Sequence, residues 1–150
     1  MDAVNPPSLT SSLAFRLGTL GTVATARFTA AVESRGLKPK HVALLATLDA
    51  GAAASQLELA QVMGVAPSLV VSLADQLQAL GAVARERDPA DRRRQTLTLT
   101  EDGRSLLHEC TALAHAVDDE LAAALSPAER ESLRRALGVL AREAGLPVAE

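Results

Sequence analysis

Five arginines lie within ten residues of this chain, from Arg85 to Arg94, in the stretch RERDPADRRR. Guanidinium groups stay charged at neutral pH and bind phosphate groups well, so the chemistry they indicate is anion binding. Residues 85–94 carry a net charge of +2, whereas residues 95–150 carry −5 and the whole chain −3. The positive charge is therefore local, which argues against a protein whose whole surface is basic and binds nucleic acid.

The segments on either side of these arginines alternate between apolar and polar residues. AVARER (82–87) and RQTLTLT (94–100) both follow a period of two, which is typical of strands, with Leu97 and Leu99 on one face. DPAD between them has the residues of a turn. The sequence therefore predicts a β-hairpin with a charged tip.

Two helical segments precede the hairpin. Ser55 and Glu58 form a capping-box pattern that opens a short helix to Met63, and Pro67 suits the first turn of a longer one that Gly81 ends. In the second helix Val70, Leu73 and Leu77 recur at helical spacing and are expected to point inward. A short and a longer helix joined by MGVAPS predict a helix-turn-helix.

Longer amphipathic segments flank this region. Apolar residues at spacings of three and four predict a helix that starts after an N-cap within 8–12 and runs to about residue 34, and further helices over about 39–50, 100–125 and 127–144, with Ser126 and Glu129 as a second capping box. The predicted fold is mainly α with a small β-hairpin wing, in a single domain over residues 1–150. A winged helix-turn-helix lobe takes up about 37–100, and dimerisation helices take up about 10–35 and 101–145.

The segment LAQVMGVAPSLVVSLADQLQALGAVARERDPADRRRQTLTLTEDG resembles the core of the MarR family of bacterial transcription regulators. The match consists of the helix-turn-helix, then LQALGAV, then a wing signature carried by Asp91, Arg93, Leu99 and Thr100. The resemblance implies a homodimer that binds pseudo-palindromic duplex DNA, and in many members a repressor released by a small molecule or by oxidation. The long terminal stripes also favour a two-fold dimer, although they would equally suit one monomeric core.

The resemblance and the helical pattern together suggest which residues contact DNA. The candidates are the outward positions of the second motif helix, the arginines of the wing and two lysines at the start of the helix over 39–50: Ser68, Leu69, Ser72, Gln76, Arg87, Arg92, Arg93, Arg94, Lys38 and Lys40. Leu69 either touches a thymine methyl group or packs inside. The alternatives are an ordinary surface helix and a solvated charged turn.

Family members commonly carry arginine on the second motif helix, and this helix has none, so we expect much of the affinity to come from the wing, the phosphates and DNA shape. By the family pattern Asp91 and Arg93 pair and brace the wing, which leaves Arg92 to enter the minor groove.

A cleft between the dimer helices and the DNA-binding lobe takes small apolar or aromatic acids in relatives. Here the candidates to line an effector cleft are Phe15, Arg16, Arg27, Phe28, His41 and Leu45. A plain core or surface role for each residue is the competing interpretation. Cys110 lies on an apolar stripe and is expected to be a buried structural thiol. His108 and His115 are too widely spaced for a typical metal site, so no metal or cofactor is expected.

Other classes of function find less support. No paired Ser/His/Asp or Cys/His constellation and no phosphate-binding loop points to an enzyme. With two Phe, no Tyr and no Trp, the platforms for stacking single-stranded bases are missing. One cysteine, no signal peptide and no convincing membrane span predict a cytoplasmic protein without a membrane partner. A winged-helix protein-interaction module without DNA binding remains the alternative to a DNA-binding regulator.

Overall fold

A computed structural model describes residues 8–51 and 55–146 of the chain. Its contacts divide into two compact units, Met1–Val117 and Asp118–Glu150. The single domain expected over residues 1–150 includes both units and stays a prediction. Residues 1–7, 52–54 and 147–150 of that span lie outside the described residues.

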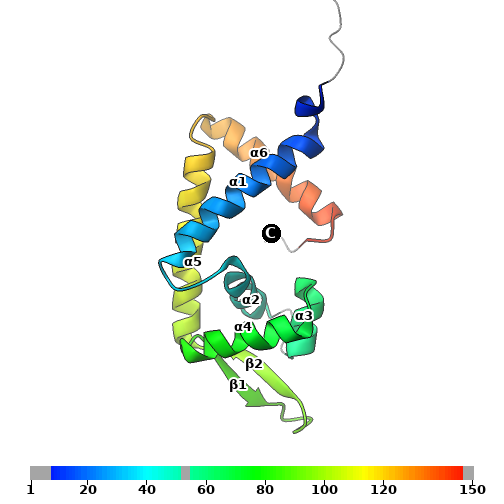
Figure 1. The fold of residues 1–150 in the computed structure, drawn as a ribbon, viewed down its shortest axis with the longest axis vertical. Helices are drawn as coiled ribbons and strands as arrows, with labels where there is room; N and C mark the ends of the chain where they lie inside the picture. Colours follow the sequence, from blue (N-terminus) through cyan, green and yellow to red (C-terminus); the bar gives the residue numbers. More distant parts are fainter. Residues whose placement is uncertain (1–7, 52–54, 147–150) are drawn as a thin grey trace, which may run out of the picture. The chain divides into compact units, whose positions relative to one another are not determined.

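The first unit holds all elements up to the long fifth helix, which continues into the second unit (Figure 1). In chain order the elements are η1 (Leu9–Ser11), α1 (Leu13–Glu33), α2 (Pro39–Asp49), α3 (Gln56–Met63), α4 (Pro67–Ala79), β1 (Val83–Arg87), β2 (Gln95–Leu99), α5 (Glu101–Leu121) and α6 (Pro127–Glu143). The mainly α fold with a two-stranded hairpin is confirmed.

Both predicted capping boxes are present and set where α3 and α6 begin. The hydroxyl of Ser55 accepts from the backbone N–H of Glu58 at 3.2 Å, and the Glu58 carboxylate accepts from the N–H of Ser55 at 2.9 Å. Ser126 and Glu129 repeat this exchange at 3.3 and 2.8 Å. Each box satisfies two backbone donors that would otherwise lack partners in the first turn.

The fifth helix ends at Leu121 rather than at the predicted residue 125. Pro127 disfavours helical geometry at the residue before it, and Ser126 accordingly has φ −66° and ψ 160°. The chain therefore leaves the helix ahead of Ser126 through a turn over residues 122–125. The prediction was too long because apolar residues keep helical spacing to Leu125, beyond the residue at which the backbone leaves the helix.

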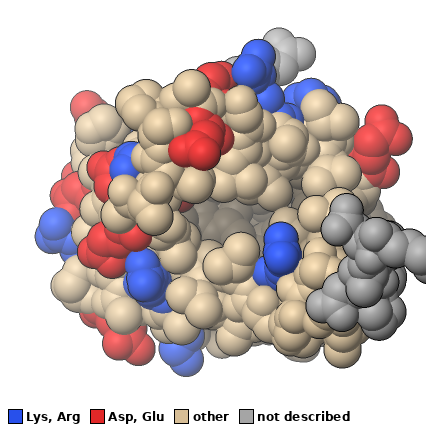
Figure 2. All heavy atoms as spheres, turned by 90° about the horizontal axis from the view of Figure 1, so that it is seen from above, with Lys and Arg blue, Asp and Glu red and all other residues tan. Residues whose placement is uncertain are grey.

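Apolar side chains remain exposed along the first and last helices. Leu13, Leu17 and Leu20 of α1 are 75, 44 and 60% exposed, and Leu133, Leu137 and Leu140 of α6 are 45, 41 and 51% exposed. Most of the residues on the face drawn in Figure 2 are neither basic nor acidic, and the Lys, Arg, Asp and Glu residues are scattered among them. Only the C-terminal part of the α1 stripe reaches the core, where Val32 is fully buried.

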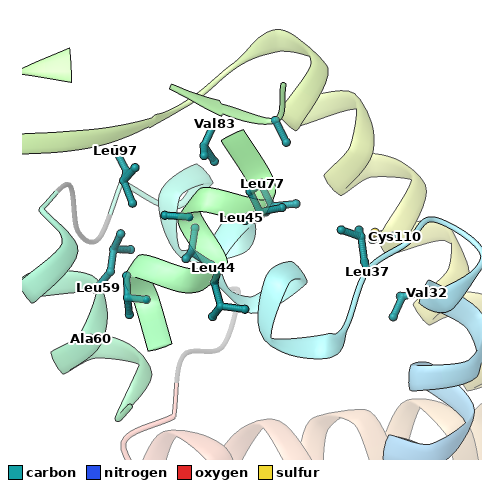
Figure 3. Close-up of a cluster of buried hydrophobic side chains, with 14 residues drawn as sticks. Val32, Leu37, Leu44, Leu45, Leu59, Ala60, Leu77, Val83, Leu97 and Cys110 are labelled. Atoms are coloured by element: carbon teal, nitrogen blue, oxygen red, sulfur yellow. The ribbon is translucent and has the colours of Figure 1, made fainter. Parts of the chain in front are cut away.

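The core of the first unit is aliphatic and draws on every element from α1 to α5 (Figure 3). Leu44 and Leu45 of α2, Leu59 of α3, Leu77 of α4 and Leu97 of β2 have essentially no exposed surface. Cys110 of α5 is also fully buried, as expected, and burial raises the pKa of its thiol. The two motif helices and the hairpin are thus fixed to one hydrophobic cluster.

Among residues 8–51 and 55–146, no individual helix has the length and apolar character needed to cross a membrane. α3 and α4 meet that test only when they are counted together across a bend of 112°.

Candidate nucleic-acid interface

The wing, which we define as residues 83–99, is an antiparallel hairpin. Val83 pairs with Leu99 at its base and Arg87 with Gln95 near its tip. Val83 and Leu97 are buried, so one face of the hairpin is anchored in the core. An isolated bridge also joins Ser55 to Thr96 and holds the return strand beside the start of α3.

Two aspartates shape the tip of the wing. The backbone N–H of Asp88 donates to the carbonyl of Arg94, and that of Arg94 to the carbonyl of Asp91, both at 2.9 Å. The carboxylate of Asp88 accepts from the N–H of Ala90 at 2.8 Å, and that of Asp91 from the N–H of Arg93 at 3.0 Å. These side-chain-to-backbone bonds two residues apart are Asx turns, which order a loop without strand pairing.

Two of the five arginines are held by acids on the motif helices. Arg85 donates to the Asp75 carboxylate at 2.5 Å and also to the side-chain oxygen of Gln78, and its own side chain is only 21% exposed. Arg94 pairs with Glu58 of α3 at 3.4 Å. These two contacts link the wing to the motif helices, although exposed ion pairs contribute little stability.

Arg87, Arg92 and Arg93 have exposed side chains. In the part of the chain that the structure describes, no ion pair or side-chain hydrogen bond engages their guanidinium groups. Asp91 and Arg93 do meet, but the aspartate accepts from the backbone N–H of Arg93 and leaves its guanidinium outward. Asp91 and Arg93 are thus joined by a side-chain-to-backbone bond, and their role as the brace of the wing stays a prediction.

The base of the wing depends on a glycine to which the sequence analysis gave no role. The Thr100 hydroxyl donates to the Gly81 carbonyl at 2.6 Å and accepts from the Gly103 N–H at 2.9 Å. A Cβ atom on Gly103 would lie 1.9 Å from the carbonyl oxygen of Ala82. Its signal in the sequence was a glycine in the first turn of a helix, where glycine is unfavourable unless a close approach requires it.

The α4 helix presents a polar stripe to solvent. Ser68, Ser72 and Gln76, four residues apart, are exposed, while Val70, Leu73 and Leu77 on the opposite side are buried as predicted. Leu69 is 38% exposed, and of the two readings left open for it the structure matches the outward one. Val71, which the sequence analysis did not single out, is 42% exposed and adds a second apolar side chain to the outer surface.

His41 joins the start of α2 to this stripe. Its Nδ1 accepts from the backbone N–H of Lys38 at 2.9 Å, and its Nε2 lies 3.1 Å from Oε1 of Gln76. Gln76 in turn donates from Nε2 to the Ser72 hydroxyl at 3.2 Å. Burial lowers the pKa of His41, with the nearby Lys38 ammonium acting in the same direction and the bond to Gln76 against it.

The two lysine candidates lie at this same helix start. Lys38 is the N-cap residue of α2 and Lys40 lies in its first turn, and both are exposed. Because His41 bonds to Gln76, these lysines belong to the part of α2 that adjoins the α4 stripe. Their role in phosphate binding stays a prediction.

The candidates for an effector cleft lie in different environments. Leu45 has no exposed surface and His41 only 2%, while Phe28 is partly buried against the core. Phe15 and Arg16 are exposed on α1, where Arg16 donates from Nε to the Thr10 carbonyl at 3.0 Å. Arg27 is exposed on α1 as well.

An open depression of about 330 Å³ lies elsewhere in the first unit. Leu80, Ala82 and Leu106 line it together with Arg35 and Glu109, which form an ion pair at 3.1 Å. It contains none of the residues expected to line the cleft, which stays a prediction. Among the described residues, no group of three or more His, Cys, Asp or Glu could hold a metal ion.

A short and a longer helix that pack on each other, followed by a hairpin on the same core, define a winged helix-turn-helix protein. The match to the MarR family model covers residues 35–94, from the end of α1 to the tip of the wing. The winged helix-turn-helix region of this chain thus matches the MarR family of transcription regulators, and solved structures similar to the chain are MarR family regulators.

Individual relatives agree with this assignment. A putative transcriptional regulatory protein for the hcr operon of Thauera aromatica is 32% identical over 109 residues, which are 73% of this chain and 64% of the relative. The present chain thus spans less than two thirds of that relative's length.

Two solved relatives are bound to DNA. The MarR family protein Rv2887 of Mycobacterium tuberculosis, in complex with DNA, is 28% identical with a TM-score of 0.75, over 86% of this chain and 97% of that one. CouR, a transcriptional repressor bound to a 23-mer duplex, is also 28% identical with a TM-score of 0.75, over 93 and 99%. CouR from Rhodococcus jostii RHA1 has also been solved with p-coumaroyl-CoA, with a TM-score of 0.71 and 27% identity over 89 and 94%.

Proposed function

We propose that this protein is a cytoplasmic regulator that binds a pseudo-palindromic duplex as a homodimer and represses transcription until a small molecule releases it. The observation that carries the DNA-binding proposal is the set of exposed arginines on the wing, Arg87, Arg92 and Arg93, beside the polar stripe of α4. The DNA complexes of Rv2887 and CouR support it, because both proteins share this fold at 28% identity.

The two parts of the interface have different tasks in this proposal. The α4 helix enters the major groove, where Ser68, Ser72 and Gln76 offer hydrogen bonds to base edges and phosphates. The wing follows the backbone, and Arg92 enters the minor groove, whose negative potential is strongest where the groove is narrow. With no cation on α4, most of the electrostatic attraction comes from the wing, from Lys38 and from Lys40.

Exposed apolar residues on the terminal helices support the homodimer. On α1, and separately on α6, leucines at helical spacing form an exposed apolar stripe, which is unfavourable in water. A two-fold dimer buries the same stripe of each subunit and presents two α4 helices to two half-sites about one helical turn apart.

Repression and release by a ligand rest on the relatives. CouR is described as a transcriptional repressor and has been solved with p-coumaroyl-CoA bound. By analogy we propose a small organic acid or its thioester as the class of effector for this chain. The cleft candidates Phe15, Arg16, Arg27 and Phe28 offer aromatic surface and positive charge to such a ligand.

A second function is a protein-interaction module that does not bind DNA. It is favoured by the apolar Leu69 and Val71 on the outer surface of α4 and by the acidic balance of the chain. Such a module has no need for three unpaired arginines on its wing, and that difference makes the two proposals separable.

The test is a fluorescence anisotropy titration of the purified protein with duplex DNA from the region upstream of its own gene. An unrelated duplex of equal length serves as the control. The proposal expects tighter binding to the upstream duplex and a strong loss of affinity in Arg92→Ala at an unchanged melting temperature. Equal, weak binding to both duplexes would favour the protein-interaction module.

A further inference from the structure

Ser72 and Gln76 belong to a hydrogen-bond chain whose direction can be derived from a single backbone group. The N–H of Lys38 can only donate, and it points at Nδ1 of His41 over 2.9 Å. That nitrogen must therefore be the acceptor of a neutral imidazole, and the ring proton must lie on Nε2. Nε2 then donates to Gln76, so the amide atom that faces it is the oxygen, 3.1 Å away.

The same logic continues to the surface of α4. With its oxygen turned to His41, Gln76 directs its NH2 group to the Ser72 hydroxyl at 3.2 Å, so that Ser72 Oγ is an acceptor there. The hydroxyl proton of Ser72 is left for a partner outside this chain. Within the described residues this hydroxyl donates no hydrogen bond, whereas Thr19, Thr22, Thr29, Thr47 and Thr111 each donate to a backbone carbonyl one turn earlier.

We infer that His41 is a positioning residue for DNA recognition: through Gln76 it fixes Ser72 as a hydrogen-bond donor on the outer surface of α4. This inference rests on the proposed function. Every donor from the Lys38 backbone to the Ser72 hydroxyl points toward the exposed stripe. The last donor in this series of hydrogen bonds, the Ser72 hydroxyl, therefore finds its acceptor on the duplex. The acceptors available there are a phosphate oxygen and the N7 and O6 atoms of purines.

The same series of hydrogen bonds also limits which bases Gln76 can recognise. Bidentate recognition of adenine by glutamine uses the amide oxygen and nitrogen together. Here the oxygen accepts from a side chain that is only 2% exposed, and the nitrogen donates to Ser72. Gln76 therefore acts as an orienting group and as a donor through its second N–H, and not as a bidentate reader of adenine.

The substitution that separates these roles is His41→Asn. The Asn side-chain oxygen stands near the position of Nδ1 and still accepts from the Lys38 N–H, but nothing replaces Nε2. The probe is the tightest duplex that the wild-type protein selects from a random-sequence pool. We expect His41→Asn and Ser72→Ala each to weaken binding of the dimer by about 10- to 100-fold, the range of two hydrogen bonds, one from each subunit.

A double-mutant cycle tests whether His41 acts through Ser72. The variant with both substitutions should bind no more than about 2-fold more weakly than Ser72→Ala alone, because the second change removes support for a donor that is already gone. His108→Asn on α5 is the matched control and should bind like the wild type at the same melting temperature. If the double variant instead lost affinity by the product of the two single losses, His41 and Ser72 would act independently, and the inference would be overturned.

The ring nitrogens of His41 provide a readout without DNA. Nitrogen NMR of the labelled protein at neutral pH should report a proton on Nε2 and none on Nδ1. The opposite tautomer would contradict the order of donors and acceptors from Lys38 to Ser72 and would overturn the inference. If the wild type selects no duplex, the proposed function fails as well. If it selects one but His41→Asn binds it unchanged, the proposed function stands and only the positioning role is lost.

Discussion

At the residue scale, His41 is a buried titratable group that links two helices. It has 2% of its surface exposed and bonds to the backbone at the start of α2 and to the side chain of Gln76 on α4. Protonation of Nδ1 would put a donor against the Lys38 N–H, so the native arrangement requires the neutral ring.

This requirement predicts a pH dependence of stability. The pKa of His41 is below its ordinary value of 6.5 in the folded protein, because of burial first and the Lys38 charge as well. The unfolded chain therefore binds more protons in acid, and the stabilisation is complete above pH 6.5 and is lost as pH falls toward the folded pKa. Urea unfolding between about pH 7.5 and about pH 5.5 should show this decline.

The same titration on His41→Asn provides the comparison. This variant should show a smaller fall in the free energy of unfolding over that range, because it lacks the shifted group. An equal pH dependence in the two proteins would show that His41 is not its source.

The arginines show how far residue types alone could be interpreted. The stretch RERDPADRRR correctly predicted a charged hairpin tip, because turn residues and strand alternation are local signals. It did not reveal that Arg94 pairs with Glu58, which lies 36 residues earlier in the chain. Such a pairing depends on the packing of the wing against α3, and no local pattern encodes it.

At the element scale, the contact between the start of α5 and the turn between α4 and β1 sets the base of the wing. Gly103 approaches Ala82 so closely that any Cβ atom would overlap its carbonyl oxygen. That oxygen accepts the Thr100 N–H at 3.1 Å, so the strand end, the helix start and the turn at Gly81 share one small set of bonds.

Gly103→Ala should therefore destabilise the protein by about 1–3 kcal/mol or more, because the overlap is with backbone that cannot move alone. Chemical denaturation measures this change. The control is Gly138→Ala in the middle of α6, where only the end of Arg142 comes within 4 Å. That variant should be stabilised by about 0.5–1 kcal/mol. If Gly103→Ala left the free energy of unfolding unchanged, that result would contradict the close approach between Gly103 and Ala82.

Helix starts were more predictable than helix ends. Ser55 and Ser126 carry their capping partners three residues on, so the sequence contained the whole signal. The predicted end of α5 was wrong by four residues because LAAAL (121–125) keeps helical periodicity after Leu121. The geometry imposed by Pro127 overrides that periodicity.

At the scale of the whole molecule, leucines at helical spacing are exposed on α1 and on α6. The sequence predicted these stripes, but it left open whether they close a monomeric core or a dimer. In the structure Leu13, Leu17 and Leu20 are all at least 44% exposed, which favours the dimer that we propose.

Sedimentation at micromolar concentration should therefore give about twice the chain mass of 15.6 kDa. Leu20→Glu places a charge within the α1 stripe and should shift the protein toward the monomer. Thr22→Glu, on the opposite side of α1, should leave the dimer intact. A wild-type protein that sediments as a monomer would contradict the homodimer.

The central claim is that the wing arginines bind the backbone of duplex DNA, and the salt dependence of binding tests it most directly. Two wings with three exposed arginines each predict a slope of log affinity against log salt on the order of −5, since each neutralised phosphate contributes about −0.9. Arg92→Ala should reduce its magnitude by about 2 in a dimer, and Arg142→Ala on α6 should not change it. A slope near zero, or one that Arg92→Ala leaves unchanged, would contradict the account.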